Sequence, residues 1–587
     1  MADQPDTISS DASKGEIDLI TKWIKRFQSS ENYYKPFFDR GRENYKLYKS
    51  FKTNSDKVYK HDIFVPYSFA YLEDMASYFM LSVLASPVTY SYSPRYLSIS
   101  EELCSEIEQL VHWALTDENT EFALEVEETI KHMGIYNAGY LINYPVTFKD
   151  GSFDHVHLDA PHPLDVFPEP GSKRLTRASW VIKRSWEKFE RLKELEKAGE
   201  YKHVDECRGG LQDQDQVTKA LQDVGIDVSK QVWKEDEQEV EVIDAMTGGD
   251  VITIGGRKAV LRDTTKDPIR PFLYDFPILD CRMTGAPGEY FGIGVIEAFK
   301  PLQRELNLLR SQRRDNISLI LDKLFIYDIL AGEVDLATLF SAPGNVIVTT
   351  NKDALSELPI EDVTASSFKE EQSIIYDIQN VTSMWDYARG ATPKRRETAS
   401  GIIRLQQAAQ GRNEWLLRKL DYYIFQPFGR RMLVYLRENI SRSDYAAVIG
   451  NKNHADEFFA LDPEQLKRMI QVQPMTESIV SVKELNVNQF MQAFDRLIQI
   501  QGVNVPALLK ALLLKLGQKN IKEILPMLSE QGQETVNSGM QQMMQQRQGL
   551  PMPAFGRPPQ EAQQGAALPP SPVSPMGEAN PNPEGGY

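Results

Sequence analysis

Cysteine is scarce in this chain, with three residues among 587. Cys104, Cys207 and Cys281 stand far apart, and no two of them form a Cys-x-x-Cys pair. The sequence therefore excludes a disulfide-stapled scaffold and a paired-cysteine metal cluster. We expect three free thiols in a reducing cytoplasm.

The chain also lacks a long uninterrupted apolar run. Its most apolar stretch, 63–88, contains Pro66, Glu73, Asp74 and Pro87, and such residues are costly inside a membrane span. We therefore expect a buried helix in this stretch and no stable membrane insertion. The N-terminal residues do not show the pattern of a secretory signal either.

Motifs of common enzymes are missing. The chain has no Gly-x-x-x-x-Gly-Lys-Ser/Thr phosphate loop and no Gly-x-Ser-x-Gly nucleophile turn. We predict no catalytic residues, no cofactor and no metal. One alternative is a metal-dependent hydrolase, because His155 and His157 would share one face of a strand. No His-Glu-x-x-His helix accompanies them, and surface histidines on a strand are the simpler interpretation.

Positive charge is in deficit. There are 66 Lys and Arg residues against 83 Asp and Glu residues, which gives a net charge of −17 and a pI near 5.2. This balance argues against a protein that coats nucleic acid through a broad basic surface. It remains compatible with a passage through which DNA slides, because acidic walls repel phosphate and reduce sticking.

What the chain has is a mixture of helical and strand periodicities, which predicts an α+β fold. Apolar and aromatic residues at helical spacing predict helices over 17–48, 101–115 and 122–133, the last ending at Gly134. Alternating patterns predict strands at 140–144, 146–148, 155–158 and 178–185, and around the turns at 247–249 and 255–256. A charged helix is expected at 186–198. The four prolines of 161–170 argue against regular structure there.

The chain is organised around the stretch from Tyr290 to Arg404. A first helix is predicted from an apolar stripe at three- and four-residue steps, interrupted only by Arg313. A compact insert follows, and then a second amphipathic helix at about 368–387. A segment rich in Gly, Pro, Lys and Arg separates it from a third, long helix that Gly411, Pro427 and Gly429 are expected to interrupt.

This order, together with three short motifs, resembles the portal proteins of tailed bacteriophages, which connect head to tail. The motifs are Gly-Ile-Gly-Val-Ile-Glu…Pro-Leu-Gln-Arg-Glu-Leu-Asn at 292–307, Arg-Arg-Asp-Asn at 313–316 and Glu-Thr-Ala-Ser-Gly at 397–401. The Asp-x-Phe-Pro-x-Pro element at 165–170 is similar to one common in portal wings. The resemblance implies a subunit that assembles as a ring.

The resemblance also implies a domain plan. It comprises a disordered N-terminus at 1–14, a wing at 15–290 with an insertion at about 200–239, a first stem helix at 291–324, a clip at 325–367, a second stem helix at 368–387, a tunnel loop at 388–399, a long bent helix at 400–440, a helical crown at 441–530 and a disordered Gln/Pro-rich tail at 531–587.

The implied function is the channel at one capsid vertex through which double-stranded DNA is packaged and later ejected. The implied setting is the virion, and the host cytoplasm during assembly. The implied partners are eleven further copies in a homododecamer, the terminase large subunit, the major capsid and scaffolding proteins, and tail or head-completion adaptors. ATP hydrolysis would belong to the terminase motor. A different ring adaptor of the virion is the alternative in the same class.

Three groups of residues are candidates for these roles. The DNA-facing tunnel loop would present Arg389, Lys394, Arg395 and Arg396. The clip would dock the motor and adaptors through Glu333, Asp335, Lys352, Asp353 and Glu357. Leu302, Leu306, Leu309, Ile375 and Ile378 are predicted to pack the ring, because two amphipathic helices cannot close a core alone and cyclic symmetry leaves no unpaired edge.

Overall fold

The computed structural model describes residues 14–51, 60–84, 89–96, 99–147, 153–207, 222–225, 239–248, 250–265, 278–322, 324–339, 346–382, 414–450 and 454–475. The chain divides into two compact units, 1–501 and 502–587, and every described residue belongs to the first. The fold is mixed helix and sheet, in agreement with the predicted α+β class. Among the described residues, no helix is both long enough and apolar enough to cross a bilayer.

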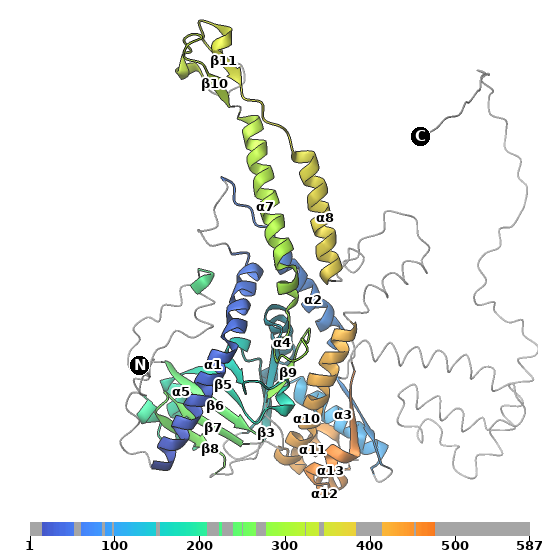
Figure 1. Cartoon of the computed structure of the whole chain (residues 1–587). Coiled ribbons are helices and arrows are strands. Elements are labelled where there is room, and N and C mark those ends of the chain that lie inside the picture. The colour runs from blue at the N-terminus through green and yellow to red at the C-terminus, as the bar shows by residue number, and fades with distance from the viewer. Residues whose placement is uncertain are drawn as a thin grey trace, which may run out of the picture. The chain divides into compact units, whose positions relative to one another are not determined.

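Helix α1 (Lys14–Tyr48) confirms the first predicted helix and supplies one wall of the core (Figure 1). Its aromatic residues recur at helical spacing and face inward, so Phe27 and Phe38 are fully buried. Both rings meet Phe167 edge to face, at centroid distances of 4.7 and 5.5 Å. Such pairs add about 0.5–1.5 kcal/mol each beyond the area they bury. The aromatic residues of this helix are therefore largely core.

Two further helices pack against α1 and against each other. They are α2 (Tyr67–Val83) and α4 (Phe122–Tyr136). A Cβ added to Gly134 of α4 would lie 2.0 Å from Leu72 Cδ1 of α2. The prediction that Gly134 ends the helix is wrong: the helix continues to Tyr136, and Asn137 ends it in the left-handed conformation at φ 57°. Gly134 is glycine because the two helices touch there.

Two sheets complete the N-terminal part of the body. The three-stranded sheet has the order β3-β2-β9, all antiparallel. Its strands are β2 (Gly139–Thr147), β3 (Phe153–Asp159) and β9 (Ile278–Cys281). The sequence missed β9, because its four residues follow a proline-rich stretch and are too few to show alternation.

The five-stranded sheet has the order β4-β5-β6-β7-β8. Its strands are β4 (Val166–Pro168), β5 (Val181–Lys188), β6 (Glu239–Thr247), β7 (Asp250–Gly255) and β8 (Ala259–Asp263). The expectation of irregular structure over 161–170 is wrong in part, since η3 (Pro163–Asp165) leads into β4. Pro168 is tolerated because β4 is an edge strand. Trp186 belongs to β5, so helix α5 (Phe189–Lys197) begins three residues later than predicted.

The structure describes only some residues of the insertion predicted at about 200–239. Those at 204–207 pack into the body. A 3-10 turn, η5 (Val204–Cys207), buries Val204 and Cys207 against Phe189, Leu192 and strands β6 and β8. Cys207 sits against Gly255, where a Cβ would come within 2.4 Å of its sulfur. All three cysteines are free and buried, in agreement with the expectation of free thiols.

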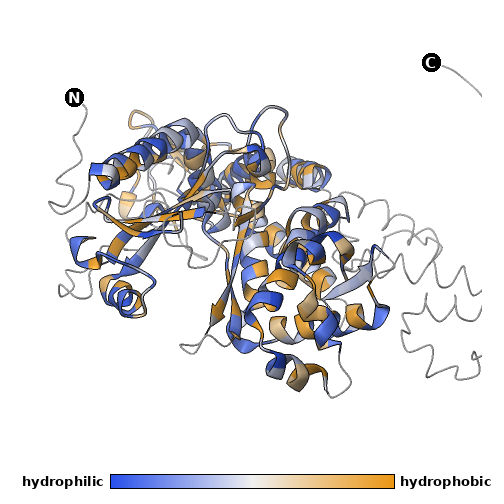
Figure 2. Ribbon diagram, turned by 90° about the horizontal axis from the view of Figure 1, so that it is seen from below, coloured by the Kyte–Doolittle hydropathy of each residue, from blue (hydrophilic) through white to orange (hydrophobic). Residues whose placement is uncertain are grey.

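The C-terminal part of the described chain returns to pair with the N-terminal part. Strand β12 (Ile470–Pro474) runs antiparallel to β1 (Tyr90–Pro94), and helix α3 (Glu101–Leu115) packs nearby. Figure 2 shows that the helices of this region carry both hydrophilic and hydrophobic residues, as expected for elements that cover a core. The remaining elements here are η2 (Glu118–Thr120), η4 (Leu175–Arg177), α11 (Arg442–Ile449), α12 (Ala455–Ala460) and α13 (Pro463–Met469).

The third long helix runs through residues 414–439 without a break. It passes from an α-helical turn into a π segment at Asp421–Phe425 and on into α10 (Gln426–Asn439). Pro427 and Gly429 were expected to interrupt the helix, but the π segment directly before Pro427 accommodates the missing amide donor. Gly429 lies against β1 and β12, where a Cβ would be 2.7 Å from both Tyr90 and Val472.

Candidate functional site: the stalk helices and their tip

Two helices form a stalk that leaves the body and returns to it (Figure 1). They are α7 (Val295–Leu321) and α8 (Thr364–Thr382), so helices are present in the two stretches where the sequence predicted them, and their role as portal stem helices stays a prediction. At 1.5 Å per residue, α7 is about 40 Å long and α8 about 28 Å. Residues 324–339 and 346–363 connect them at the far end and are called the tip below.

The root of the stalk is fixed by the residues that precede α7. Phe291 stacks on Phe37 of α1 with ring centroids 3.5 Å apart. Tyr290 is buried and donates a hydrogen bond to Asp280 at 3.2 Å. A Cβ on Gly292 would lie 1.9 Å from the carbonyl oxygen of Thr284. The first glycine of the Gly-Ile-Gly motif is thus required because two backbone segments nearly touch.

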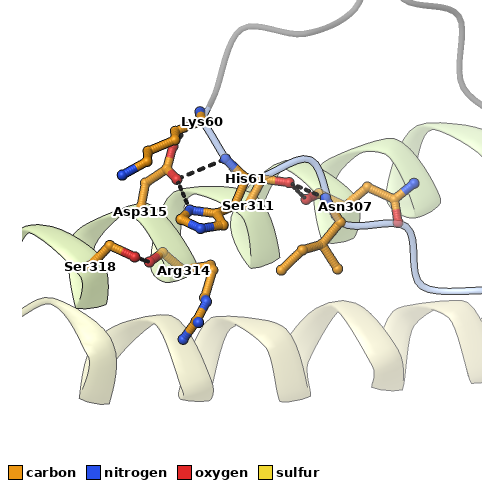
Figure 3. Close-up of polar contacts among 8 residues, drawn as sticks. Lys60, His61, Asn307, Ser311, Arg314, Asp315 and Ser318 are labelled. Atoms are coloured by element: carbon orange, nitrogen blue, oxygen red, sulfur yellow. Dashed lines mark hydrogen bonds and ion pairs between the residues drawn. The ribbon is translucent and has the colours of Figure 1, made fainter.

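One face of α7 carries a ladder of polar side chains at four-residue steps. Its members are Gln303, Asn307, Ser311 and Asp315. They bind the backbone of the extended segment 60–65, which lies along the helix (Figure 3). Four helical residues advance about 6 Å, and two extended residues advance about 6.6 Å. The two repeats match, so every second residue of the segment 60–65, which is called the strap below, meets the next polar residue of α7.

The individual contacts of this strap are short. The amide of Val65 donates to Asn307 Oδ1 at 2.9 Å, and the amide of Ile63 donates to Ser311 Oγ at 3.1 Å. Gln303 Nε2 donates to the carbonyl of Val65 at 2.6 Å. These four polar residues of α7 therefore replace the partners that an extended backbone would otherwise find in a sheet or in water.

Asp315 holds the outer end of the strap. Its carboxylate accepts from the amides of Lys60 and His61, both at 3.0 Å, and contacts His61 Nδ1 at 2.7 Å. Desolvation raises the pKa of Asp315, but the hydrogen bonds from His61 and Lys60 outweigh this effect and lower the pKa below its ordinary value. Asp315 is therefore charged while it holds the strap.

A charged clamp joins α7 to α8. Arg313 interrupts the apolar stripe in the sequence, and the structure buries its side chain to 5% exposure beside Glu371 of α8, at 2.5 Å. Arg310 also pairs with Glu371, and the Arg313 guanidinium lies 4.0 Å from the ring centroid of Phe368. Removing one member of such a buried group costs about 3–5 kcal/mol, because the remaining charge is left uncompensated.

The tip is small and poorly buried. It contains a two-stranded antiparallel sheet, β10 (Phe325–Tyr327) with β11 (Leu355–Glu357), the 3-10 turns η7 (Leu336–Thr338) and η8 (Lys352–Ala354), and one bridge between Val334 and Thr349. Within the described tip, Val334 and Ala354 are its buried apolar residues. A two-stranded sheet of this size is at best marginally stable alone.

Large apolar side chains instead face outward over the tip. Leu330 is 97% exposed and Ile329 is 77% exposed. The exposed set is Leu324, Phe325, Ile326, Ile329, Leu330, Leu336, Val346, Ile347, Val348, Leu358 and Val363. Concentrations of exposed apolar residues mark surfaces that another molecule covers.

The five charged residues predicted for docking all lie on this tip and are exposed. One of them has an evident local role: the Asp335 carboxylate accepts from the amide of Ala337 at 3.0 Å and caps η7. The predicted docking role of all five residues, Glu333, Asp335, Lys352, Asp353 and Glu357, stays a prediction.

The residues predicted to pack the ring divide into two groups. Leu306 and Ile378 are buried within the subunit, at 0% and 3% exposure. Leu302, Leu309 and Ile375 are partly buried. The large apolar side chains of the stalk that are exposed are a different set from the five predicted to pack the ring: Leu308, Leu319, Leu321, Phe368, Tyr376 and Val381.

A helical wheel identifies an apolar stripe but does not say which neighbour covers it. The body and the neighbouring stalk helix already cover part of the predicted stripe, so the prediction that all five residues are free to pack a ring is not confirmed.

The predicted tunnel-loop residues Arg389, Lys394, Arg395 and Arg396 lie outside the described residues. So do the first part of the predicted long helix, at 400–413, and the predicted crown and tail beyond 475. The second stem helix was predicted to continue to 387, and its residues after Thr382 are also outside. The role of the basic segment stays a prediction.

The histidines of the metal alternative lie on β3 beside Tyr144 of β2. His155 Nδ1 contacts Asp154 at 3.2 Å, and the rings of His155 and His157 are 6.4 Å apart. Burial lowers the pKa of His157. Within the described ranges, no group of three or more His, Cys, Asp or Glu side chains is arranged to hold a metal ion.

Comparison with known proteins does not add a relative: no protein-family model matches the chain, and no curated protein matches it. Function must therefore be inferred from the motifs and from the stalk itself. The distinctive feature is the pair of helices α7 and α8, which are joined by the ion pairs of Glu371 and contacted by residues 60–65. Their far end carries the exposed apolar side chains of the tip.

Proposed function

We propose that this protein is the subunit of a ring-shaped portal, through which double-stranded DNA enters and leaves a bacteriophage capsid. The observation that carries the proposal is the stalk with its exposed apolar tip. A monomer with this tip would leave more than ten large apolar side chains in water. The motif order from Gly292 to Gly401, which resembles portals, supports the same assignment.

A closed ring accounts for the exposed surface economically. Each fully buried Leu, Ile, Val or Phe side chain contributes about 1.5–3 kcal/mol. The small β10–β11 sheet has two open edges, and a cyclic array of identical copies covers the edges and the apolar residues on every subunit. In this proposal the tip is the clip, α7 and α8 form the stem, and the body is the wing.

The proposed channel needs to guide DNA without holding it. The net charge of −17 favours a surface that repels phosphate, and the basic segment 389–396 would supply brief, salt-dependent contacts near the axis. The tip would dock the terminase motor during packaging and a tail or head-completion adaptor afterwards. The subunit itself would carry no catalytic residue, and the ring would reside at a capsid vertex in the virion.

Electron microscopy of the purified full-length protein tests the assembly. We expect class averages of rings with a central hole. A monodisperse monomer at micromolar concentration, across low and moderate salt, would reject the proposal. The triple variant Lys394→Ala, Arg395→Ala, Arg396→Ala should still form rings but impair DNA packaging or retention. Normal packaging by this variant would remove the basic segment from the proposed role without affecting the ring.

A further inference from the structure

A pocket on the body gathers positive charge from three separate parts of the chain. Its cavity is about 450 Å³. Two of the parts are the segment around η4 and the end of strand β9, and the third is the long helix at 414–439. Their cationic residues at the pocket are Lys173, Arg174, Arg177, Arg282 and Lys419. Five cations against two carboxylates, Asp280 and Glu289, is an unusual balance in a chain with a net charge of −17.

The carboxylate at the base of the pocket is already engaged. Asp280 lies 3.7 Å from Arg282 and accepts a hydrogen bond from Tyr290 at 3.2 Å. Arg282 also donates to the carbonyl of Lys173 at 3.1 Å and lies over the ring of Tyr290 at 4.7 Å. Burial raises the pKa of Asp280, although Arg282 opposes this effect. Asp280 thus lies next to Arg282, and the charge of Arg174 acts on it in the same direction as that of Arg282.

The other cations form no close ion pair among the described residues. The side chains of Lys173, Arg174 and Arg177 are exposed, and no carboxylate in the described ranges forms an ion pair with them or with Lys419. Lys419 Nζ donates to the carbonyl of Met283 at 2.8 Å. Burial lowers the pKa of Lys419; Cys281 opposes this effect, and the neighbouring charge of Arg282 adds to it. Holding these cations together has an electrostatic cost, and within the described ranges no close ion pair offsets it for these four residues.

Exposed aromatic rings flank the same pocket. Trp415 is 59% exposed, and its ring lies 5.7 Å from Lys419 Nζ. Tyr423 lines the pocket and is 42% exposed, and its neighbour Tyr422 is 66% exposed. Basic side chains with exposed aromatic rings beside them provide both charge and a stacking surface for a nucleotide unit.

We propose that this pocket binds a phosphate group, supplied either by a nucleic-acid backbone or by free phosphate. A single carboxylate would leave several of the converging cations unmatched. A phosphate offers more negative charge and several acceptor oxygens, and Arg174 and Arg177 can engage it in paired hydrogen bonds. The site does not depend on ring assembly, and within the proposed portal it would be a contact for DNA outside the basic segment 389–396.

The experiment uses the full-length protein with two probes, inorganic phosphate and a short labelled DNA duplex. We expect both to bind, with binding reported by the fluorescence of Trp415 and, for DNA, by anisotropy. The double variant Arg174→Ala, Arg177→Ala should weaken DNA binding by about 10- to 100-fold and reduce its slope against log salt by about 2. Trp415→Phe should remove the fluorescence response and retain the anisotropy response.

The matched control is Lys22→Ala, Lys25→Ala, which removes two exposed charges from α1 and should leave both probes bound. Phosphate binding without DNA binding would assign the site to a free anion, and competition between the probes would assign it to the DNA backbone. Equal binding by the double variant and the control would overturn the proposal. So would loss of oligomers in the double variant with unchanged probe binding, since the pocket would then receive carboxylates of a second copy.

Discussion

The body and the tip of the stalk differ in how far they bury their large apolar side chains. In the body, Phe27, Phe38 and Phe428 are fully buried inside one connected core. On the tip, Leu330 is almost entirely exposed and the small sheet has little beneath it. The described residues of the body bury their large apolar side chains within the chain, whereas those of the tip do not, and the proposed ring would cover the tip. The stalk lies between them and is held by polar contacts that need no partner.

The largest expected effect breaks this comparison at the tip. Ile329→Asp combined with Leu330→Asp should abolish assembly, because two side chains worth about 1.5–3 kcal/mol each on burial are replaced by charges. The melting temperature of the body should stay unchanged. Light scattering measures the assembly, and circular dichroism follows the body. Assemblies of normal size from this double variant would show that the tip is not covered by another copy.

The clamp should give the next largest effect. Glu371→Ala leaves Arg310 and Arg313 without their counter-charge and should cost about 3–5 kcal/mol at the junction of α7 and α8. Hydrogen exchange of α8 should increase, while that of α4 should not. The neighbouring exposed Glu370→Ala is the control and should change stability by less than about 0.5 kcal/mol. Equal protection of α8 in both variants would mean that the clamp does not hold the stalk.

A third prediction concerns the body alone. Gly134→Ala places a Cβ 2.0 Å from Leu72 Cδ1 and should destabilise the protein by about 1–3 kcal/mol through overpacking. Gly15→Ala, in the open first turn of α1, is the matched control and should be neutral or slightly stabilising. Chemical denaturation gives both values. A neutral Gly134→Ala would mean that α2 and α4 can separate at little cost.

The smallest expected effect is a dependence of the protein's stability on pH, which comes from His454 in the C-terminal part of the described chain. The hydrogen bond between His454 Nδ1 and Glu106, at 2.7 Å, raises the pKa of His454 despite some desolvation. Because the pKa is raised in the folded state, the contribution of this hydrogen bond to the stability of the protein is fully present below the ordinary histidine pKa. It is lost as the pH rises through the raised value. The side chain is 41% exposed, so the loss should stay below about 1 kcal/mol.

Thermal melts of the wild type and His454→Gln between pH 5 and 9 measure this contribution, where the pH range is set by the ordinary pKa of about 6.5. The difference between the two proteins should be largest at low pH and should shrink as the pH rises. A constant difference across the range would show that His454 contributes only through its packing.

Helices with a strong apolar period could be predicted from the sequence. The bounds of α3 agree residue by residue with the prediction, and α1 and α7 agree closely, because a period of 3.6 repeated over many residues leaves little ambiguity. Strands β4 and β9 were missed because each has only three or four residues. Such strands are held by pairing with distant segments, and that pairing leaves no local pattern.

The candidate site was only partly predictable for the same reason. The sequence located the two helices and the insert between them, and it placed the charged residues of the insert correctly on an exposed surface. It did not show that Leu306 is buried within the chain or that Leu330 is exposed to solvent, since both are leucines next to other apolar residues. The basic pocket was missed because its cations come from residues 173–177, 282 and 419.

The sequence by itself determined the helical periods, the interruption between α7 and α8, and the scarcity of cysteine, because these are properties of neighbouring residues. Only the tertiary structure decided which side chains serve each contact. In the sequence, Arg313 only interrupts an apolar stripe. In the structure, Glu371, which is 58 positions later, lies 2.5 Å from it and forms an ion pair with it. The polar residues 303, 307, 311 and 315 likewise gained their meaning from a backbone segment about 240 residues earlier, because a hydrogen bond depends on distance in space and not on distance along the chain.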